Sequence, residues 1–252
     1  MRDVILDKLH EIEQEEHVRI LLAVESGSRA WGFASPDSDY DVRFIYVRPK
    51  NDYLRLEEVR DVIELPINEV LDINGWDLNK ALRLLYKSNP TLFEWLSSPI
   101  VYLDNGFRDR LTPFLSRYFS CKHGLYHYIG TAKKNYHEFL QDNTVKAKKY
   151  FYVLRPVLAC KWILERGTQP PMLFSQLAEA ELDDALKPEV ERLLDLKMNA
   201  PETKMIPRVD ALNKYLEDSM ESIERRIKTL PETRNEWQPL NELFLAELGE
   251  TI

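Results

Sequence analysis

The chain has 252 residues, 44% hydrophobic and 30% charged, which is typical of a folded globular protein and not of a long disordered segment. Its net charge of −8 argues against nonspecific binding to duplex DNA, which depends on phosphate neutralisation by Lys and Arg. No stretch reaches the roughly 20 apolar residues of a membrane span. With only two cysteines and no apolar core of a signal peptide, we expect a cytoplasmic protein with reduced thiols.

The first hundred residues mix helical and strand patterns. Apolar residues at helical spacing predict a helix over 4–16. A second helical pattern starts at Asp77, a plausible N-cap, and stops at Asn89-Pro90, after which TLFEWLS continues as helix. Segments rich in apolar and β-branched residues predict four strands, at 18–26, 41–49, 59–65 and 69–74. The last two would form a hairpin around Pro66.

The remainder of the chain has helical periodicity interrupted by prolines and by Gly167. The pattern contains no repeat and no flexible linker. We therefore expect an α+β domain over 1–103 and an all-helical domain over 104–252. The predicted helices of the second part are 106–119, 121–141, 145–166, 173–181, 187–198, 209–230 and 234–248.

Acidic residues crowd the start of the second predicted strand. Asp39 and Asp41 are two residues apart, so their side chains would lie on one face of the strand. Two adjacent carboxylates repel unless a cation neutralises them, and oxygen ligands favour Mg²⁺ or Mn²⁺ over zinc. A calcium loop of the EF-hand type is excluded, because Val42 and Arg48 stand where it needs Gly and Glu. Asp37 is expected to lie outside the metal site.

A Gly-Ser turn follows the first predicted strand. Gly27 and Ser28 precede a short predicted helix over 29–31, and backbone N–H groups beside a serine hydroxyl form an anion site. The Gly-Ser turn would bind a triphosphate, and the aspartates would bind the metals. Arg43 is a further candidate for this site because it shares strand parity with the aspartates.

Four segments of the chain resemble a known family: ESGSRAWGFASPDSDYDVRFIYVRP, LDINGWDLNKALRLL, SNPTLFEWLSSPIVY and KKYFYVLRP. A Gly-Ser turn followed by D-x-D is similar to the signature of the DNA polymerase β-like nucleotidyltransferase superfamily. The longer segments, between about residues 20 and 175, resemble its RlaP or YcgL-like family. The resemblance implies a minimal nucleotidyltransferase fold, which is a small mixed sheet flanked by helices, followed by a helical domain.

The resemblance also implies a chemistry. Such enzymes transfer a nucleoside monophosphate from an NTP, here expected to be ATP, and release pyrophosphate. Two Mg²⁺ ions would bind Asp39, Asp41 and a third carboxylate from a neighbouring strand. We favour Asp72, inside the predicted strand VLDIN; Glu64 and Asp77 are the alternatives, and Asp77 is better suited to cap a helix.

One segment of this acidic chain is basic. Range 117–161 contains nine Lys or Arg residues and only two acidic ones. Within it Lys148, Tyr152 and Arg155 fall at i, i+4 and i+7 and would form one stripe of a helix. We expect these residues and Lys149 to bind the nucleotide, with Lys148 or Lys149 reaching the triphosphate. The alternative is a solvated face with tyrosine packed beneath lysine stems.

The sequence leaves the acceptor open: a protein hydroxyl, a small molecule or an RNA end would each suit this chemistry. A rival hypothesis from another class is a regulatory protein that keeps the fold and senses a nucleotide, or partners a toxin, without turnover. An intact Gly-Ser turn and D-x-D pair argue for the enzyme.

Overall fold

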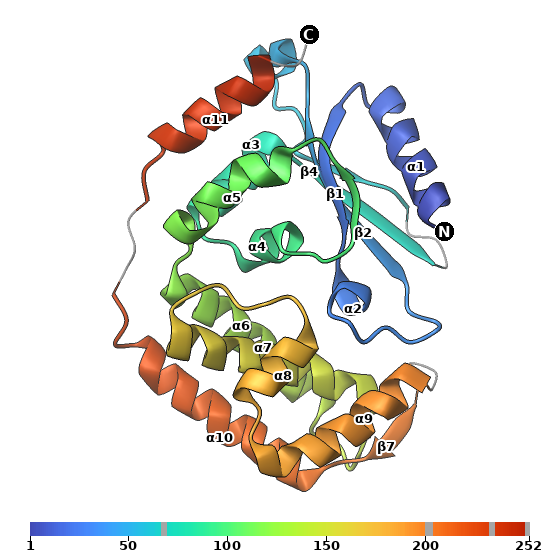
Figure 1. Ribbon diagram of the computed structural model, residues 1–252, viewed down its shortest axis with the longest axis vertical. Helices are drawn as coiled ribbons and strands as arrows, with labels where there is room; N and C mark the ends of the chain where they lie inside the picture. The colour runs from blue at the N-terminus through green and yellow to red at the C-terminus, as the bar shows by residue number, and fades with distance from the viewer. Residues whose placement is uncertain (67–69, 200–203, 232–234, 250–252) are drawn as a thin grey trace. The chain divides into compact units, whose positions relative to one another are not determined.

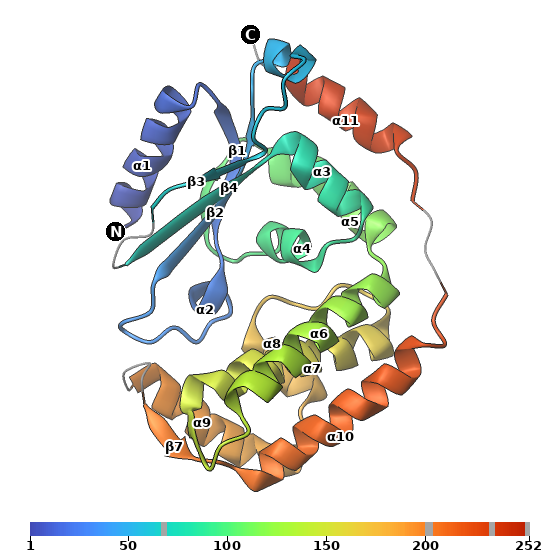
Figure 2. The same cartoon turned by 180° about the vertical axis from the view of Figure 1, so that it is seen from behind.

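The computed structural model describes residues 1–66, 70–199, 204–231 and 235–249 (Figure 1; Figure 2 shows the reverse view). Contacts divide the chain into two compact units. The first unit contains Met1–Gly27, Asp39–Tyr118 and the C-terminal segment with the last helix. The second contains Ser28–Ser38 and the chain from Phe119 onwards until that segment.

These units differ from the single boundary at 103/104 that the sequence suggested. Helix α5 (Phe107–Tyr118) stays with the sheet, because its residues Phe107 and Leu111 are fully buried and the helix contacts β1 and α3. The loop before the D-x-D pair goes with the second unit, because Phe33 is buried in the helical core. The chain therefore passes from one unit to the other and back between Gly27 and Asp39.

The first unit is built on a five-stranded mixed sheet of order β3-β4-β2-β1-β5. The pair β2–β4 is parallel, whereas β1–β2, β1–β5 and β3–β4 are antiparallel. The strands are β1 (Arg19–Glu25), β2 (Tyr40–Val47), β3 (Val62–Glu64), β4 (Leu71–Asp77) and β5 (Val101–Asp104).

Helices cover both faces of this sheet (Figure 1). Helix α1 buries Ile5, Leu9 and Ile12 against alternate residues of β2 such as Phe44, which places the other residues of β2 on the opposite face. Gly75 of β4 is required there, because a Cβ would lie 2.2 Å from the Phe44 ring. The helical elements of this unit are α1 (Arg2–Glu15), η1 (Lys50–Leu54), α3 (Leu78–Tyr86), α4 (Pro90–Leu96), α5 and α11 (Gln238–Gly249).

The second unit is a helical bundle with one short two-stranded sheet. Helix α7 contributes more residues to its core than any other described helix, and Val153, Leu154, Val157 and Leu158 are fully buried. The elements are α2 (Gly27–Ala30), α6 (Cys121–Phe139), β6 (Thr144–Lys146), α7 (Ala147–Arg166), α8 (Phe174–Glu181), η2 (Asp184–Leu186), α9 (Lys187–Asn199), β7 (Met205–Pro207) and α10 (Asp210–Ile227).

The expected α+β class, the mixed sheet and the C-terminal helices are confirmed. The hairpin is also confirmed as the antiparallel pair β3–β4, although β3 is only three residues long and the turn residues 67–69 lie outside the described part of the chain. The sequence did not predict strand β5 or the pair β6–β7. Among the described residues no helix has the length and apolarity needed to cross a membrane.

Candidate active site

Two carboxylates meet where β2 and β4 run side by side. The parallel register places Asp41 of β2 directly beside Asp72 of β4. Both strands bury the intervening residues, such as Val42 and Ile73, on the face covered by α1, so the acids lie on the opposite face. The predicted pairing of the strand containing Asp72 with the D-x-D strand is confirmed.

Arg43 joins these two carboxylates. Its Nη2 donates to Asp41 Oδ1 at 3.0 Å and to Asp72 Oδ2 at 2.7 Å. Its Nη1 donates to the backbone oxygens of Val42 at 3.0 Å and Asp72 at 2.9 Å. The strand parity that made Arg43 a candidate therefore brings its guanidinium to the acids.

Gly27 lies against the Asp41 carboxylate. A Cβ at Gly27 would be 2.0 Å from Asp41 Oδ2, and the glycine has φ +58°, a value that other L-residues rarely adopt. The carboxylate of Asp41 thus occupies the space that a Cβ at Gly27 would need, so the glycine brings turn and acid into direct contact.

The sequence reasoning missed Glu25, the last residue of β1. Its side chain is fully buried, at 0% exposure. One oxygen accepts a hydrogen bond from the backbone N–H of Asp41 at 2.7 Å, and the other accepts one from the Tyr102 hydroxyl. The Ser98 hydroxyl also donates to the Glu25 backbone oxygen at 2.6 Å. Glu25 thus holds the backbone that carries Asp41. The signal for it was a charged residue ending an otherwise apolar strand.

The remaining acids and the serine of the segment from the Gly-Ser turn to the D-x-D pair occupy different positions. Asp39 is exposed and lies just before the first paired residue of β2, whereas Asp37 belongs to the second unit. Ser28 is buried within α2. Among the described residues no three His, Cys, Asp or Glu side chains form a group arranged to hold a metal ion. The donor set that does converge, Asp41 with Asp72, offers the hard oxygen ligands that Mg²⁺ prefers.

The two alternatives for the third carboxylate have other partners. Glu64 on β3 accepts hydrogen bonds from Arg60 and from Asn74 Nδ2, the latter at 3.0 Å. Asp77 caps α3, as expected, by accepting from the Asn79 backbone N–H at 2.8 Å, and also accepts from the Tyr53 hydroxyl at 2.9 Å. Burial raises the pKa of Asp77 to about 6. Asp72 is the alternative that the register brings to Asp41.

The loop between the Gly-Ser turn and the D-x-D pair is anchored within the second unit. The Phe33 ring packs against Phe151 and Phe174, with centroid distances of 5.3 and 5.6 Å. The ammonium of Lys197 on α9 is buried at 4% exposure and lies 3.4 Å from the hydroxyls of Ser35 and Ser38. Nothing in the local sequence indicated Lys197, because its partners are some 160 residues away in the chain.

The predicted nucleotide-binding residues of α7 have aromatic neighbours. Lys149 Nζ lies 3.3 Å from the centroid of Phe139 and 5.1 Å from that of Tyr152. Arg155 is only 4% exposed, and its guanidinium lies over the Trp31 ring at 4.5 Å. Lys148 and Tyr152 are half-buried. The environment of Arg155 is that of a packing residue, whereas the lysines remain partly accessible.

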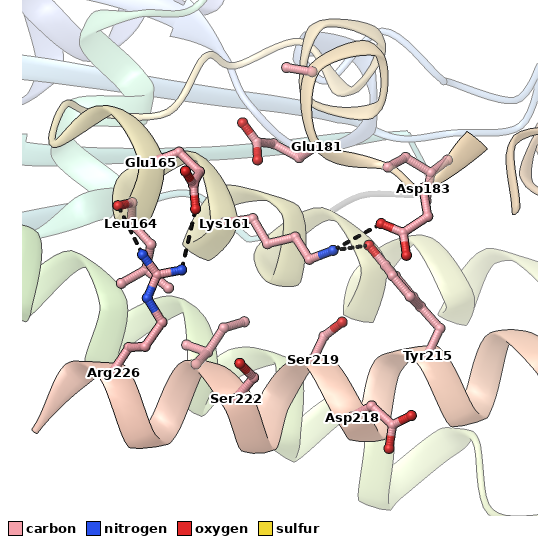
Figure 3. Close-up of a pocket in the computed structure, with 13 residues that line it drawn as sticks. Lys161, Leu164, Glu165, Glu181, Asp183, Tyr215, Asp218, Ser219, Ser222 and Arg226 are labelled. Carbon is pink, nitrogen blue, oxygen red and sulfur yellow. Dashed lines mark hydrogen bonds and ion pairs between the residues drawn. The ribbon is translucent and has the colours of Figure 1, made fainter. Parts of the chain in front are cut away.

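A cavity of about 580 Å³ in the second unit lies among α7, α8 and α10 (Figure 3). Several of its charged groups are paired: Lys161 donates to the Tyr215 hydroxyl at 2.8 Å and to Asp183 at 3.4 Å, and Arg226 pairs with Glu165 at 3.3 Å. None of the residues predicted for the site lines it. Neither Asp41 nor Asp72 lines the cavity.

Comparison with known proteins agrees with the sequence motifs. The model of RlaP, the "RNA repair pathway DNA polymerase beta family", matches residues 1–246. A Bacillus subtilis (strain 168) protein named "Uncharacterized protein YcgL" is 47% identical over 253 residues, covering 99% of this chain and 97% of that protein.

Two solved structures also align with the chain. One is a nucleotidyltransferase-like protein from Exiguobacterium sibiricum 255-15, with 15% identity and a TM-score of 0.31, covering 87% of this chain and 73% of that one. The other is spectinomycin adenyltransferase AAD(9) from Enterococcus faecialis with ATP and spectinomycin, with 10% identity and a TM-score of 0.43, covering 89% and 98%. From the match along almost its whole length, the chain belongs to the RlaP family of DNA polymerase β-type nucleotidyltransferases.

Proposed function

We propose that the protein is a divalent-metal-dependent nucleotidyltransferase that transfers a nucleoside monophosphate from an NTP, with ATP as the first candidate, to an acceptor hydroxyl. The observation that carries the proposal is the parallel register that sets Asp41 beside Asp72, with Gly27 in contact with Asp41. Two adjacent carboxylates on one sheet face are suited to a cation, and the family of the chain uses an NTP.

Each residue has a role in this proposal. Asp41 and Asp72, joined by Asp39, would hold Mg²⁺ or Mn²⁺. The metal would neutralise phosphate charge and polarise the reacting phosphoryl group. Gly27 and Ser28 would bind the triphosphate through backbone N–H groups and the serine hydroxyl.

The bond changes are those of a displacement at phosphorus. The acceptor oxygen forms a bond to the α-phosphorus, the bond from that phosphorus to the oxygen bridging to the β-phosphorus breaks, and pyrophosphate leaves. The acceptor proton passes to a base, for which the Asp72 carboxylate is the candidate. Glu25 contributes indirectly, because it holds the Asp41 backbone through a 2.7 Å hydrogen bond.

Binding of the nucleotide by the second unit is a further part of the proposal. Lys148 and Lys149 are half-buried cations, so part of each side chain remains accessible, which supports a phosphate contact. Tyr152 neighbours Lys149, and Arg155 is held over Trp31, so we assign these two residues to support of the lysine-bearing face.

The name of the family refers to RNA repair, which favours an RNA end as the first acceptor to test, ahead of a protein hydroxyl or a small molecule. A nucleotide-sensing protein without turnover is the second candidate. The observation that favours it is the pairing of Arg43 with both Asp41 and Asp72, which offsets part of their negative charge without a metal.

One experiment separates the two candidates. The full chain is incubated with each α-labelled NTP, Mg²⁺ and RNA oligonucleotides with defined ends, and pyrophosphate release and label transfer are measured. We expect wild type to release pyrophosphate and the double variant Asp39→Ala/Asp41→Ala to fall to background. The neighbouring exposed acid supplies a matched control, Asp37→Asn, which should retain activity. NTP binding without pyrophosphate release in wild type would favour the sensor, and equal release by the double variant would refute the metal site.

A further inference from the structure

The guanidinium of Arg43 lies where the carboxylates of Asp41 and Asp72 converge. One nitrogen, Nη2, is within 3.0 Å of Asp41 Oδ1 and 2.7 Å of Asp72 Oδ2, so a single N–H-bearing atom contacts one oxygen of each acid. The other oxygen of Asp41, Oδ2, lies against Gly27. A cation shared by the two acids would approach the same point that Arg43 fills.

Arg43 also forms hydrogen bonds to the backbone of the two strands, which do not involve the carboxylates. Nη1 donates to the backbone oxygens of Val42 and Asp72, at 3.0 and 2.9 Å. The Arg43 side chain is 17% exposed, and those of Asp41 and Asp72 are 30% and 28% exposed. The three side chains are therefore accessible to water and ions, while the hydrogen bonds hold the arginine between the two acids.

We propose that Arg43 is the internal counter-ion of this carboxylate pair and that it competes with a divalent cation for Asp41 and Asp72. This inference rests on the proposed metal-dependent function. Without a cation, two neighbouring carboxylates would repel each other, and Arg43 relieves that repulsion. The three groups together carry a charge of −1; when Arg43 leaves, the two acids present −2, which matches a divalent ion.

The opposite role for Arg43 makes the opposite prediction. If Arg43 were a brace that orients the acids for the metal, its removal would weaken metal binding. Competition predicts that removal strengthens it, because the metal no longer has to displace a bound cation. A bound unit positive charge opposes the approach of a divalent ion, so its removal should raise the affinity for the metal roughly tenfold.

The test is titration of the full chain with Mn²⁺ alone, followed by the electron paramagnetic resonance signal of the free ion. We expect Arg43→Gln to bind Mn²⁺ roughly tenfold more tightly than wild type. We expect Asp41→Asn to abolish this Mn²⁺ binding, both in the wild-type chain and in the Arg43→Gln variant. Arg60→Gln removes the same charge from the neighbouring strand pair, where Arg60 contacts Glu64, and should leave affinity within about twofold. Circular dichroism and a thermal melt confirm that each variant is folded.

A second variant covers the case in which Arg43→Gln does not fold. Arg43→Lys keeps the charge but loses the second nitrogen, which anchors the side chain to the backbone oxygens of Val42 and Asp72, so it should bind Mn²⁺ about threefold more tightly than wild type. If wild type binds Mn²⁺ through Asp41 but the folded Arg43 variants bind it no more tightly than wild type, the proposed competition is refuted and the metal site is not. If folded wild type and variants all fail to bind Mn²⁺, with or without a non-hydrolysable ATP analogue, the metal site and the proposed function fail with it.

Discussion

Arg43 in the sheet unit and Arg155 in the helical unit occupy opposite surroundings. Arg43 contacts two carboxylates in a group that water can reach, whereas Arg155 is 4% exposed, lies over the Trp31 ring and contacts the Met172 backbone oxygen at 3.4 Å. A cation held by carboxylates can be exchanged for another cation, but one that lies in an aromatic core leaves only if the core opens. Charge alone therefore does not identify a functional arginine; its partners do.

The largest expected effect concerns the carboxylates that hold Arg43. Asp72→Asn should lower the rate of nucleotidyl transfer by roughly 10²–10³-fold, because the metal loses a ligand. Glu64→Gln is the matched variant, since Glu64 lies one strand further from Asp41. Pyrophosphate release at saturating NTP measures both, and a larger loss for Glu64→Gln would assign the third carboxylate to Glu64.

Gly27→Ala should have the next largest effect. The new Cβ would lie 2.0 Å from Asp41 Oδ2, so the carboxylate must move, and the alanine would have to adopt a φ of +58°. A displacement of about 1 Å near the reacting groups costs on the order of 10²-fold in rate. Gly130 in α6 has no atom within 4 Å of its Cβ position, so Gly130→Ala should leave the rate unchanged and stabilise the fold by about 0.5–1 kcal/mol. Steady-state rates and urea unfolding test the pair, and near wild-type turnover by Gly27→Ala would contradict the contact.

Asp77 sharpens the comparison, because it lies on the same strand as Asp72 but is buried and caps a helix. Burial raises the pKa of Asp77 in the folded state to about 6, from 3.8. Between pH 3.8 and about pH 6 the folded protein therefore binds a proton that the unfolded chain does not. The stability that this proton contributes is lost as the pH rises through about 6. The Asp77→Asn variant keeps an oxygen that can cap the helix, but its side chain does not titrate, so it does not lose this stability as the pH rises. Its free energy of unfolding relative to wild type should therefore rise by about 2 kcal/mol between about pH 4 and pH 7.5. Urea unfolding across this range measures it, and a constant difference would contradict the buried-carboxylate account.

The smallest expected effect is in the helical unit. Arg155→Met should reduce the free energy of unfolding by about 1 kcal/mol, through loss of the contact with Trp31, and leave the KM for NTP unchanged. Lys148→Met is the contrasting variant, and we expect it to raise that KM with little change in stability. If Arg155→Met instead raised KM while keeping full stability, Arg155 would be a nucleotide ligand and its contrast with Arg43 would disappear.

The sequence predicted the fold largely from local patterns. The helix after Asp77 and the break at Asn89-Pro90 follow from capping and proline chemistry, and the structure has both. Strand β5 has only four residues and follows a serine-rich turn, so its pattern is too short to distinguish from a loop. Its pairing with β1 comes from a contact that no local pattern encodes.

The candidate site was predictable where strand parity determines position. Alternation placed Arg43 on the side of the aspartates, and the strand pattern around Asp72 indicated a neighbour for β2. Parity cannot show which groups pair, so the bridge by Arg43 required the structure. Glu25 and Lys197 were missed because their roles arise from contacts between distant parts of the chain.

The most direct measurement is a crystal structure of the full chain with Mn²⁺ and a non-hydrolysable NTP analogue, with the metal located by its anomalous signal. We predict a Mn²⁺ ion within roughly 2.0–2.3 Å of carboxylate oxygens of both Asp41 and Asp72, with Arg43 Nη2 no longer bonded to both acids. A metal bound elsewhere, with Arg43 still pairing Asp41 and Asp72, would contradict the account.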